Sequence, residues 1–75
     1  MTEYTAKFRS RYRDCTYYYV RPTTAYSPNT FTVEIKDDGS ARVQYYELPW
    51  ETEAEVLLAA YAKHTQESYI KAIEP

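Results

Sequence analysis

Residues 4–13 alternate strictly between two kinds of side chain. Successive side chains of a strand point to opposite faces, so an extended chain would place each kind on its own face. One set is Tyr4, Ala6, Phe8, Ser10 and Tyr12, and the other is Lys7, Arg9, Arg11 and Arg13. The pattern predicts a half-buried strand over about 4–13 with a basic outer face.

A second strand is predicted over about 16–21, where β-branched and aromatic residues with a high strand preference follow one another. Asp14 and Cys15 can form the connecting turn. This turn lacks glycine, so a hairpin and one long bent strand over about 4–21 both fit the pattern. The following segment, 22–29, has the proline, serine and asparagine content of a loop.

The clearest unit is a hairpin with strands over about 31–36 and 41–47. A two-residue turn at Asp38-Gly39 would place Ile35 opposite Arg42 and so mix core and surface residues on one face. A three-residue loop with Gly39 in the left-handed conformation avoids this conflict. It pairs Ile35 with Ala41, Val33 with Val43, Phe31 with Tyr45, and Glu34 with Arg42.

A helix is predicted over about 53–73. Thr52 and Glu55 have the spacing of a capping box, and Glu53 lies in the first turn, where the helix dipole favours negative charge. An apolar stripe recurs at spacings of four and three through Leu58, Ala62, Thr65, Tyr69 and Ala72, flanked by Tyr61 and Ile73. A break near His64, which would give two shorter helices, is the alternative.

These elements predict an α+β fold: an antiparallel sheet of three to four strands packed by one long C-terminal helix, in the order β-β-β-β-α. At 75 residues the chain has room for one core, so we expect residues 1–75 to form a single compact domain. The expected core comprises Phe8, Tyr12, Phe31, Val33, Ile35, Val43, Tyr45, Leu58, Tyr61, Ala62, Tyr69 and Ile73.

Cysteine usage and hydropathy narrow the setting of the protein. Cys15 is the only cysteine, so no intramolecular disulfide can form. The N-terminus lacks the apolar run of a signal peptide, and no stretch approaches the roughly 20 apolar residues that span a bilayer. We expect a soluble, cytoplasmic protein without a membrane partner. Its small core must be stabilised by packing or by association, a homodimer included.

Few residues point to catalysis. Cys15 and His64 could form a thiolate pair, but they belong to separate elements and no flanking motif supports the pair. A single cysteine and a single histidine do not make a usual zinc site, and Asp37-Asp38-Gly39 lacks the remaining ligands of a calcium loop. Gly39 is the only glycine, which excludes a glycine-rich phosphate loop. We therefore expect no catalytic residue, metal or cofactor, and a protein that is not an enzyme.

Charge is distributed unevenly along the chain, although the net charge is only −2. Residues 1–30 carry five basic and two acidic groups, whereas residues 31–75 carry four basic and nine acidic groups. The basic strand can serve as a contact surface, and it can equally protect a sheet edge from aggregation.

The ten tyrosines are the most unusual feature of the composition. Tyrosine and arginine are enriched at protein interfaces, which predicts a small non-catalytic protein that binds a protein partner, as an inhibitor or adaptor of the phage or mobile-element accessory type. The predicted contact residues are Arg9, Arg11, Arg13, Tyr17, Tyr18 and Tyr19, with Trp50, Val56 and Leu57 as a second patch. The alternative is binding of single-stranded nucleic acid by the same basic, tyrosine-rich strand face, although no RRM, KH or OB signature is present.

Overall fold

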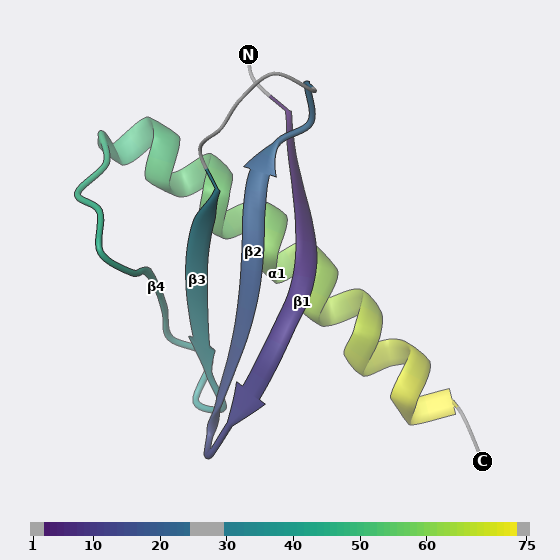
Figure 1. Cartoon of the computed structure of the whole chain (residues 1–75). Coiled ribbons are helices and arrows are strands. Elements are labelled where there is room, and N and C mark those ends of the chain that lie inside the picture. Colours follow the sequence, from purple (N-terminus) through teal and green to yellow (C-terminus); the bar gives the residue numbers. More distant parts are fainter. Residues whose placement is uncertain (1–2, 25–29, 74–75) are drawn as a thin grey trace.

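The computed structural model describes residues 3–24 and 30–73, with side chains described as far as Glu67. Four strands and one helix follow one another: β1 (Tyr4–Tyr12), β2 (Cys15–Pro22), β3 (Phe31–Lys36), β4 (Ala41–Val43) and α1 (Trp50–Ile73). The strands form one antiparallel sheet in the order β1-β2-β3-β4, and α1 crosses one face of it (Figure 1). The predicted α+β fold is confirmed.

The first two strands form a hairpin rather than one bent strand. Tyr12 pairs with Cys15, so the turn consists of Arg13 and Asp14, one residue earlier than predicted. Arg13 adopts a left-handed backbone conformation with a φ of 58°. That conformation at the first central position is a feature of type II′ hairpin turns, in which glycine usually supplies it.

A β-bulge interrupts β1 at Arg9. Phe8 pairs with Tyr18 and Ser10 pairs with Tyr17, so two residues of β1 advance while β2 advances by one. An extra residue reverses the alternation of every side chain that follows it. The predicted strict alternation is therefore wrong beyond Phe8: Arg11 is directed to the helix-covered face.

The second hairpin has the predicted register through its first three pairs. Ile35 pairs with Ala41, Glu34 with Arg42 and Val33 with Val43, and Gly39 has the expected left-handed conformation with a φ of 94°. The pairing does not continue to Phe31 and Tyr45, because β4 ends at Val43. Tyr45 has a positive φ of 69° and its side chain is 90% exposed. The predicted strand over 41–47 is thus too long.

The helix begins earlier than predicted and is continuous past His64. Its first residue is Trp50, and the carbonyl of Pro49 already accepts a hydrogen bond from the backbone of Glu53 at 2.9 Å. Thr52 therefore lies inside the first turn, where it cannot serve as the N-cap of the predicted capping box. Glu51 and Glu53 occupy the first turn, which suits the helix dipole.

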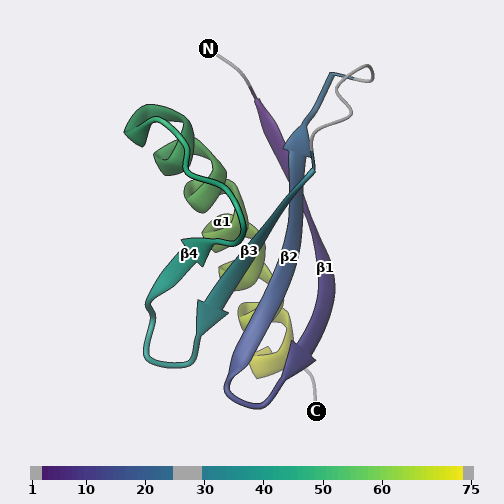
Figure 2. The same ribbon diagram turned by 60° about the vertical axis from the view of Figure 1, so that its left-hand side comes forward.

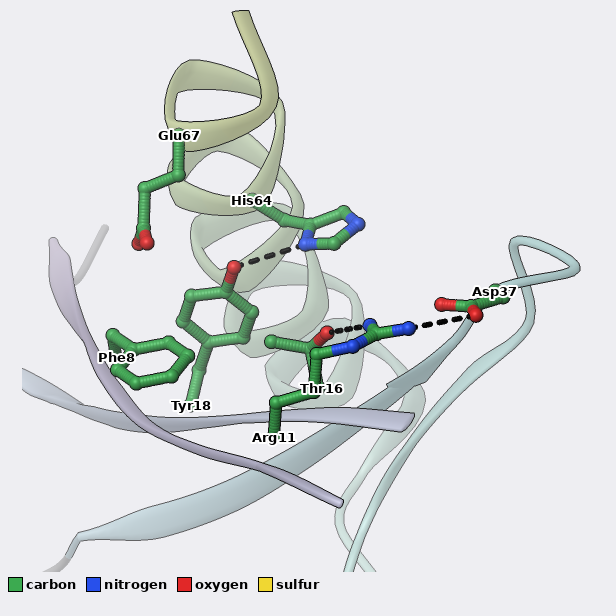
Figure 3. Close-up of a pocket in the computed structure, with 7 residues that line it drawn as sticks. All are labelled: Phe8, Arg11, Thr16, Tyr18, Asp37, His64 and Glu67. Atoms are coloured by element: carbon green, nitrogen blue, oxygen red, sulfur yellow. Dashed lines mark hydrogen bonds and ion pairs between the residues drawn. The ribbon is translucent and has the colours of Figure 1, made fainter. Parts of the chain in front are cut away.

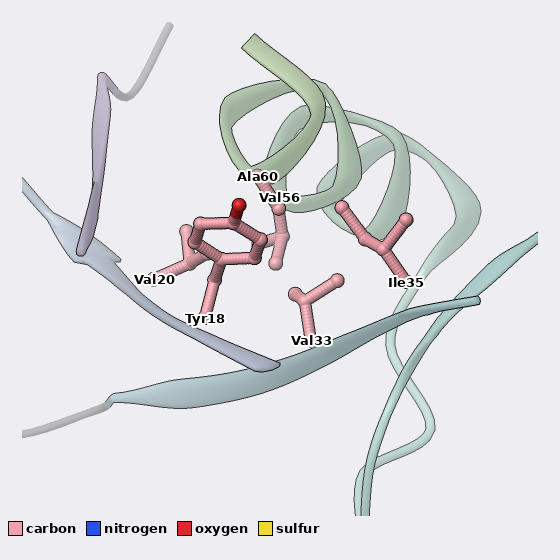
Figure 4. Close-up of a cluster of buried hydrophobic side chains, with 6 residues drawn as sticks. All are labelled: Tyr18, Val20, Val33, Ile35, Val56 and Ala60. Atoms are coloured by element: carbon pink, nitrogen blue, oxygen red, sulfur yellow. The ribbon is translucent and has the colours of Figure 1, made fainter. Parts of the chain in front are cut away.

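The core lies between the sheet and the first half of α1 (Figure 4). Its fully buried residues are Tyr18, Val20, Val33, Ile35, Val56 and Ala60. Of the predicted core, Val33 and Ile35 are confirmed as buried, and Phe31, Val43 and Tyr61 are half-buried against the cluster. Phe8, Tyr12, Tyr45, Leu58 and Ala62 are exposed, so their prediction as core is wrong. The side chains of Tyr69 and Ile73 fall outside the described part of the chain.

The helix turns a different side to the sheet from the one predicted. Val56 and Ala60 are completely buried, whereas Leu58 on the predicted stripe is 67% exposed. The first half of α1 is apolar nearly all round, so its periodicity does not select one face. Packing against the sheet selects the side that carries Val56 and Ala60.

Candidate functional site

Within residues 3–24 and 30–73, only one face of the sheet is covered. Figures 1 and 2 show α1 on one side, and on the other side no helix or strand of the described chain. Side chains from β1 to β4 alternate between the two faces, and the uncovered face, here called the open face, carries Arg9, Tyr17, Tyr19, Glu34 and Arg42. These residues are neighbours across four strands although they are spread over 34 positions of the sequence.

Arg9 is held over the rings of two tyrosines. Its guanidinium carbon lies 5.8 Å from the ring centroid of Tyr17 and 5.5 Å from that of Tyr19. Its Nε also donates a hydrogen bond to the hydroxyl of Tyr19 at 3.0 Å. Arg9 is the bulged residue of β1, and its guanidinium extends over two residues of the neighbouring strand β2. The result is an arginine with a fixed orientation on an exposed surface.

Glu34 anchors the tyrosine side of this arrangement. Its side chain is only 8% exposed, and Oε2 accepts hydrogen bonds from the hydroxyl of Tyr17 at 3.0 Å and from the amide of Gln44 at 3.3 Å. Oε1 forms an ion pair with Arg42 at 3.3 Å. The hydrogen bond to Glu34, followed by burial, raises the pKa of Tyr17 to about 12. Tyr17 is therefore a protonated donor at neutral pH, and its ring is fixed in place.

A shallow hollow of about 470 Å³ adjoins Arg9 on the open face. Lys7 and Arg21 flank it, with Tyr19 between them, and Thr5 and Thr30 supply hydroxyl groups at its rim. Lys7 is paired with Tyr19 and Thr5 with Arg21 across the two strands. The hollow therefore extends the positive charge of Arg9 along β1 and β2.

A second arginine–tyrosine contact lies at the β1–β2 turn. The guanidinium carbon of Arg13 is 5.2 Å from the ring centroid of Tyr12, and both side chains are exposed. The reversal at the bulge brings Tyr12 to the open face, where it joins Arg9 instead of facing away from it. The sequence alternation had placed Tyr12 and the arginines on opposite faces.

The structure brings together only part of the predicted contact surface. Arg9, Tyr17 and Tyr19 are neighbours, and Arg13 lies at the nearby turn. Tyr18 is only 1% exposed and belongs to the core, so its prediction as a contact residue is wrong. Arg11 lies on the other face, where it donates hydrogen bonds to Thr16 and Asp37, each at 2.8 Å.

The predicted second patch is not supported as a unit. Val56 is fully buried and Leu57 is half-buried against the core, because α1 turns this side toward the sheet. Trp50 is exposed at the start of α1. Sequence reasoning missed Glu34 as an organising residue, although its predicted position opposite Arg42 was a usable signal.

The sequence candidates for a thiolate pair are separated by the sheet. Cys15 lies on the open face, like Tyr17 two residues later in the same strand. His64 lies on the covered face, where it forms a hydrogen bond with Tyr18. Burial, and then the hydrogen bond to Asp14, raises the pKa of the Cys15 thiol, which opposes formation of the thiolate.

In residues 3–24 and 30–73, no three His, Cys, Asp or Glu side chains are grouped so as to hold a metal ion. The described helix lacks the length and apolar character needed to cross a membrane. No protein-family model, curated protein or solved structure matches this chain. Its chemistry must therefore be inferred from its own residues.

Proposed function

We propose that this chain is a non-catalytic binding protein that holds an acidic surface of a protein partner against the open face of its sheet. The observation that carries the proposal is the position of Arg9 above Tyr17 and Tyr19 on an uncovered face. Lys7 and Arg21 place further positive charge beside it. An inhibitor or adaptor role is compatible with such a surface.

Preorganisation supports a role for Arg9 at an interface. Ordering a long side chain on binding costs about 0.5–1.5 kcal/mol, and much of this cost is already met when the guanidinium is held before the partner arrives. Nε of Arg9 is occupied by the Tyr19 hydroxyl, while its terminal nitrogens have no hydrogen-bond partner among the described residues. Those two nitrogens can bind a carboxylate in a bidentate manner. Arginine and tyrosine are also the residue types that dominate interface energetics.

The same geometry favours a protein over a stacked nucleic acid. Proteins that bind single strands stack bases on exposed aromatic rings. Here Arg9 already lies over both Tyr17 and Tyr19, so a base would have to displace it. A carboxylate can bind Arg9 without any such rearrangement.

The test compares three arginine variants in capture of a partner from a native lysate. Arg9→Ala should lose the partner, and Arg9→Lys should retain it poorly, because lysine keeps the charge but not the planar pair of donors. Arg11→Ala is the matched control, since it removes an arginine from the same strand but from the opposite face. The affinity of the Arg9→Ala variant for the captured partner should be at least about tenfold lower than that of the unmodified protein. The affinity of the Arg11→Ala variant should change little.

Folding must be checked for each variant by circular dichroism and urea unfolding. Arg9 is exposed, so Arg9→Ala should leave the fold intact. If Arg9→Ala and Arg11→Ala bind the partner equally well, or if the partner's contact surface is not acidic, the proposal is wrong.

Binding of single-stranded nucleic acid is the second candidate. One finding favours it. The sequence alternation predicts that Tyr12 and Arg9 lie on opposite faces, but the bulge places both on the open face. Phosphate contacts release counterions, so the logarithm of affinity would fall by about 0.7 per contact for each tenfold rise in salt. Nuclease-sensitive capture with this steep salt dependence would favour nucleic acid over protein.

A further inference from the structure

The covered face contains a separate cavity of about 280 Å³ that the proposed binding function does not use. It lies between β1, β2 and the second half of α1, beyond the apolar core (Figure 3). Phe8 forms an apolar wall, and this residue is 45% exposed. The volume lies just below the usual range for small-molecule sites, so it fits a short chain of atoms rather than a large ligand.

One wall of this cavity holds an ion pair whose charges cancel. Arg11 donates to the hydroxyl of Thr16 and forms an ion pair with Asp37, both at 2.8 Å. The hydrogen bond and the charge of Asp37 raise the pKa of Arg11, and those of Arg11 lower the pKa of Asp37. This pair stays ionised and contributes no net charge to the cavity.

The opposite wall holds a neutral hydroxyl. Tyr18 Oη lies 2.9 Å from Nδ1 of His64, and the two rings meet edge to face with centroids 5.8 Å apart. Burial, and then the charge of Glu67, raises the pKa of Tyr18 to about 12, so its hydroxyl is protonated at neutral pH. If this hydroxyl donates to His64, its oxygen can still accept a hydrogen bond from a ligand.

Glu67 is the unsatisfied group of the cavity. Its carboxylate points from α1 toward the sheet (Figure 3), and Oε1 is inaccessible and has no hydrogen-bond partner in the described structure. A buried polar atom without a partner is costly, and more so when it carries charge. Among the described residues that line the cavity, Arg11 and Asp37 form an ion pair, so Glu67 is the carboxylate without a basic partner.

We propose that this cavity binds a primary ammonium group, with the ammonium at Glu67 and its alkyl chain against Phe8. An ammonium in the cavity neutralises the carboxylate, and rotation of the carboxylate about its last side-chain bond lets Oε1 accept the hydrogen bond that it lacks. The three donors of the ammonium can also reach the oxygen of Tyr18. Two sources present this group on a short alkyl chain: a free alkylamine and a lysine side chain of another protein.

The first probe is n-butylammonium chloride, with n-butanol as the uncharged control and sodium chloride at matched ionic strength. A ligand of this size should bind with a dissociation constant on the order of 1 mM. Saturable binding should raise the unfolding temperature and shift the imidazole NMR signals of His64. Butanol should do neither. A short peptide with one lysine and blocked ends distinguishes the sources, since it binds only if the site also accepts a protein side chain.

Glu67→Gln tests the carboxylate directly. The amide keeps the shape but removes the charge, so butylammonium should bind about ten- to a hundredfold more weakly. Glu47→Gln, which makes the same charge change at an exposed position, should bind as the unmodified protein does. Because Oε1 lacks a partner, Glu67→Gln should remain folded and no less stable.

Two results would overturn the proposal. One is the absence of saturable butylammonium binding to the unmodified protein, which would leave Glu67 to water alone. The other is equal binding to the protein and to its folded Glu67→Gln variant. Neither result bears on the open face, because Arg9 and Glu67 lie on opposite sides of the sheet.

Discussion

The two faces of the sheet differ most clearly at three consecutive tyrosines, residues 17–19. Tyr18 is completely buried under α1, whereas Tyr17 and Tyr19 lie on the open face. Each hydroxyl has a partner: His64 for Tyr18, Glu34 for Tyr17 and Arg9 for Tyr19. The same residue type thus contributes a large buried surface on one face and a fixed polar contact on the other.

The two faces differ in what holds their side chains in place. On the covered face apolar side chains from three elements exclude water, and this burial supplies most of the free energy of folding. On the open face a nearly buried carboxylate, Glu34, orders the side chains around it without an element to cover them. We therefore expect substitutions on the covered face to change stability, and those on the open face to change binding.

The largest expected effect is on the covered face. Ile35→Ala removes a side chain that is 1% exposed and leaves a cavity, so it should lower the free energy of unfolding by about 3 kcal/mol. Thr32→Ala, on the open face of the same strand, should cost less than about 1 kcal/mol. Urea unfolding followed by circular dichroism measures both. Similar losses for the two variants would mean that the faces do not differ as described.

An intermediate effect is expected from alkaline pH, which acts on both faces. The folded-state pKa values of Tyr17 and Tyr18 are raised from 10.0 to about 12, so folding favours their neutral hydroxyls. Their stabilisation is complete below the ordinary pKa and is lost as the pH rises through about 10 to 12. Unfolding free energies measured across this range should fall steeply.

Single replacements divide this alkaline loss between the faces. Tyr18→Phe and Tyr17→Phe should each make the decline shallower, because each removes one of the raised pKa values. Tyr45→Phe, at an exposed position, serves as the control. If neither replacement changes the slope more than the control does, the folded surroundings of these two tyrosines do not raise their pKa values enough to affect pH-dependent stability.

The sequence predicts the fold better than it predicts the faces. The element order and the β3–β4 register follow from alternation and from one glycine, because a wrong register would mix core and surface residues. The bulge at Arg9 has no such signal, because residues 4–13 alternate without interruption across it. Its consequence is large, because it transfers Arg11 to the covered face.

The helix shows a second limit. Val56 and Leu58 are both apolar, and only tertiary packing determines that Val56 is buried while Leu58 is exposed. Of the candidate site, the sequence identifies Arg9, Tyr17 and Tyr19 by residue type. It does not reveal that Arg9 covers both rings, because that contact depends on the pairing of β1 with β2 and on the rotamer of Arg9.

The smallest expected effect lies at the turn that joins β1 to β2. Arg13 has a φ of 58°, a conformation that costs a residue with a Cβ about 1 kcal/mol relative to glycine. Arg13→Gly and Arg13→Ala both remove the guanidinium and its contact with Tyr12, but only glycine relieves the backbone. Arg13→Gly should therefore be the more stable of the two by about 1 kcal/mol in urea unfolding. Equal stabilities would show that the turn is not strained. A more stable glycine variant that captures the partner less well would mean that Arg13 occupies this position for binding and not for folding.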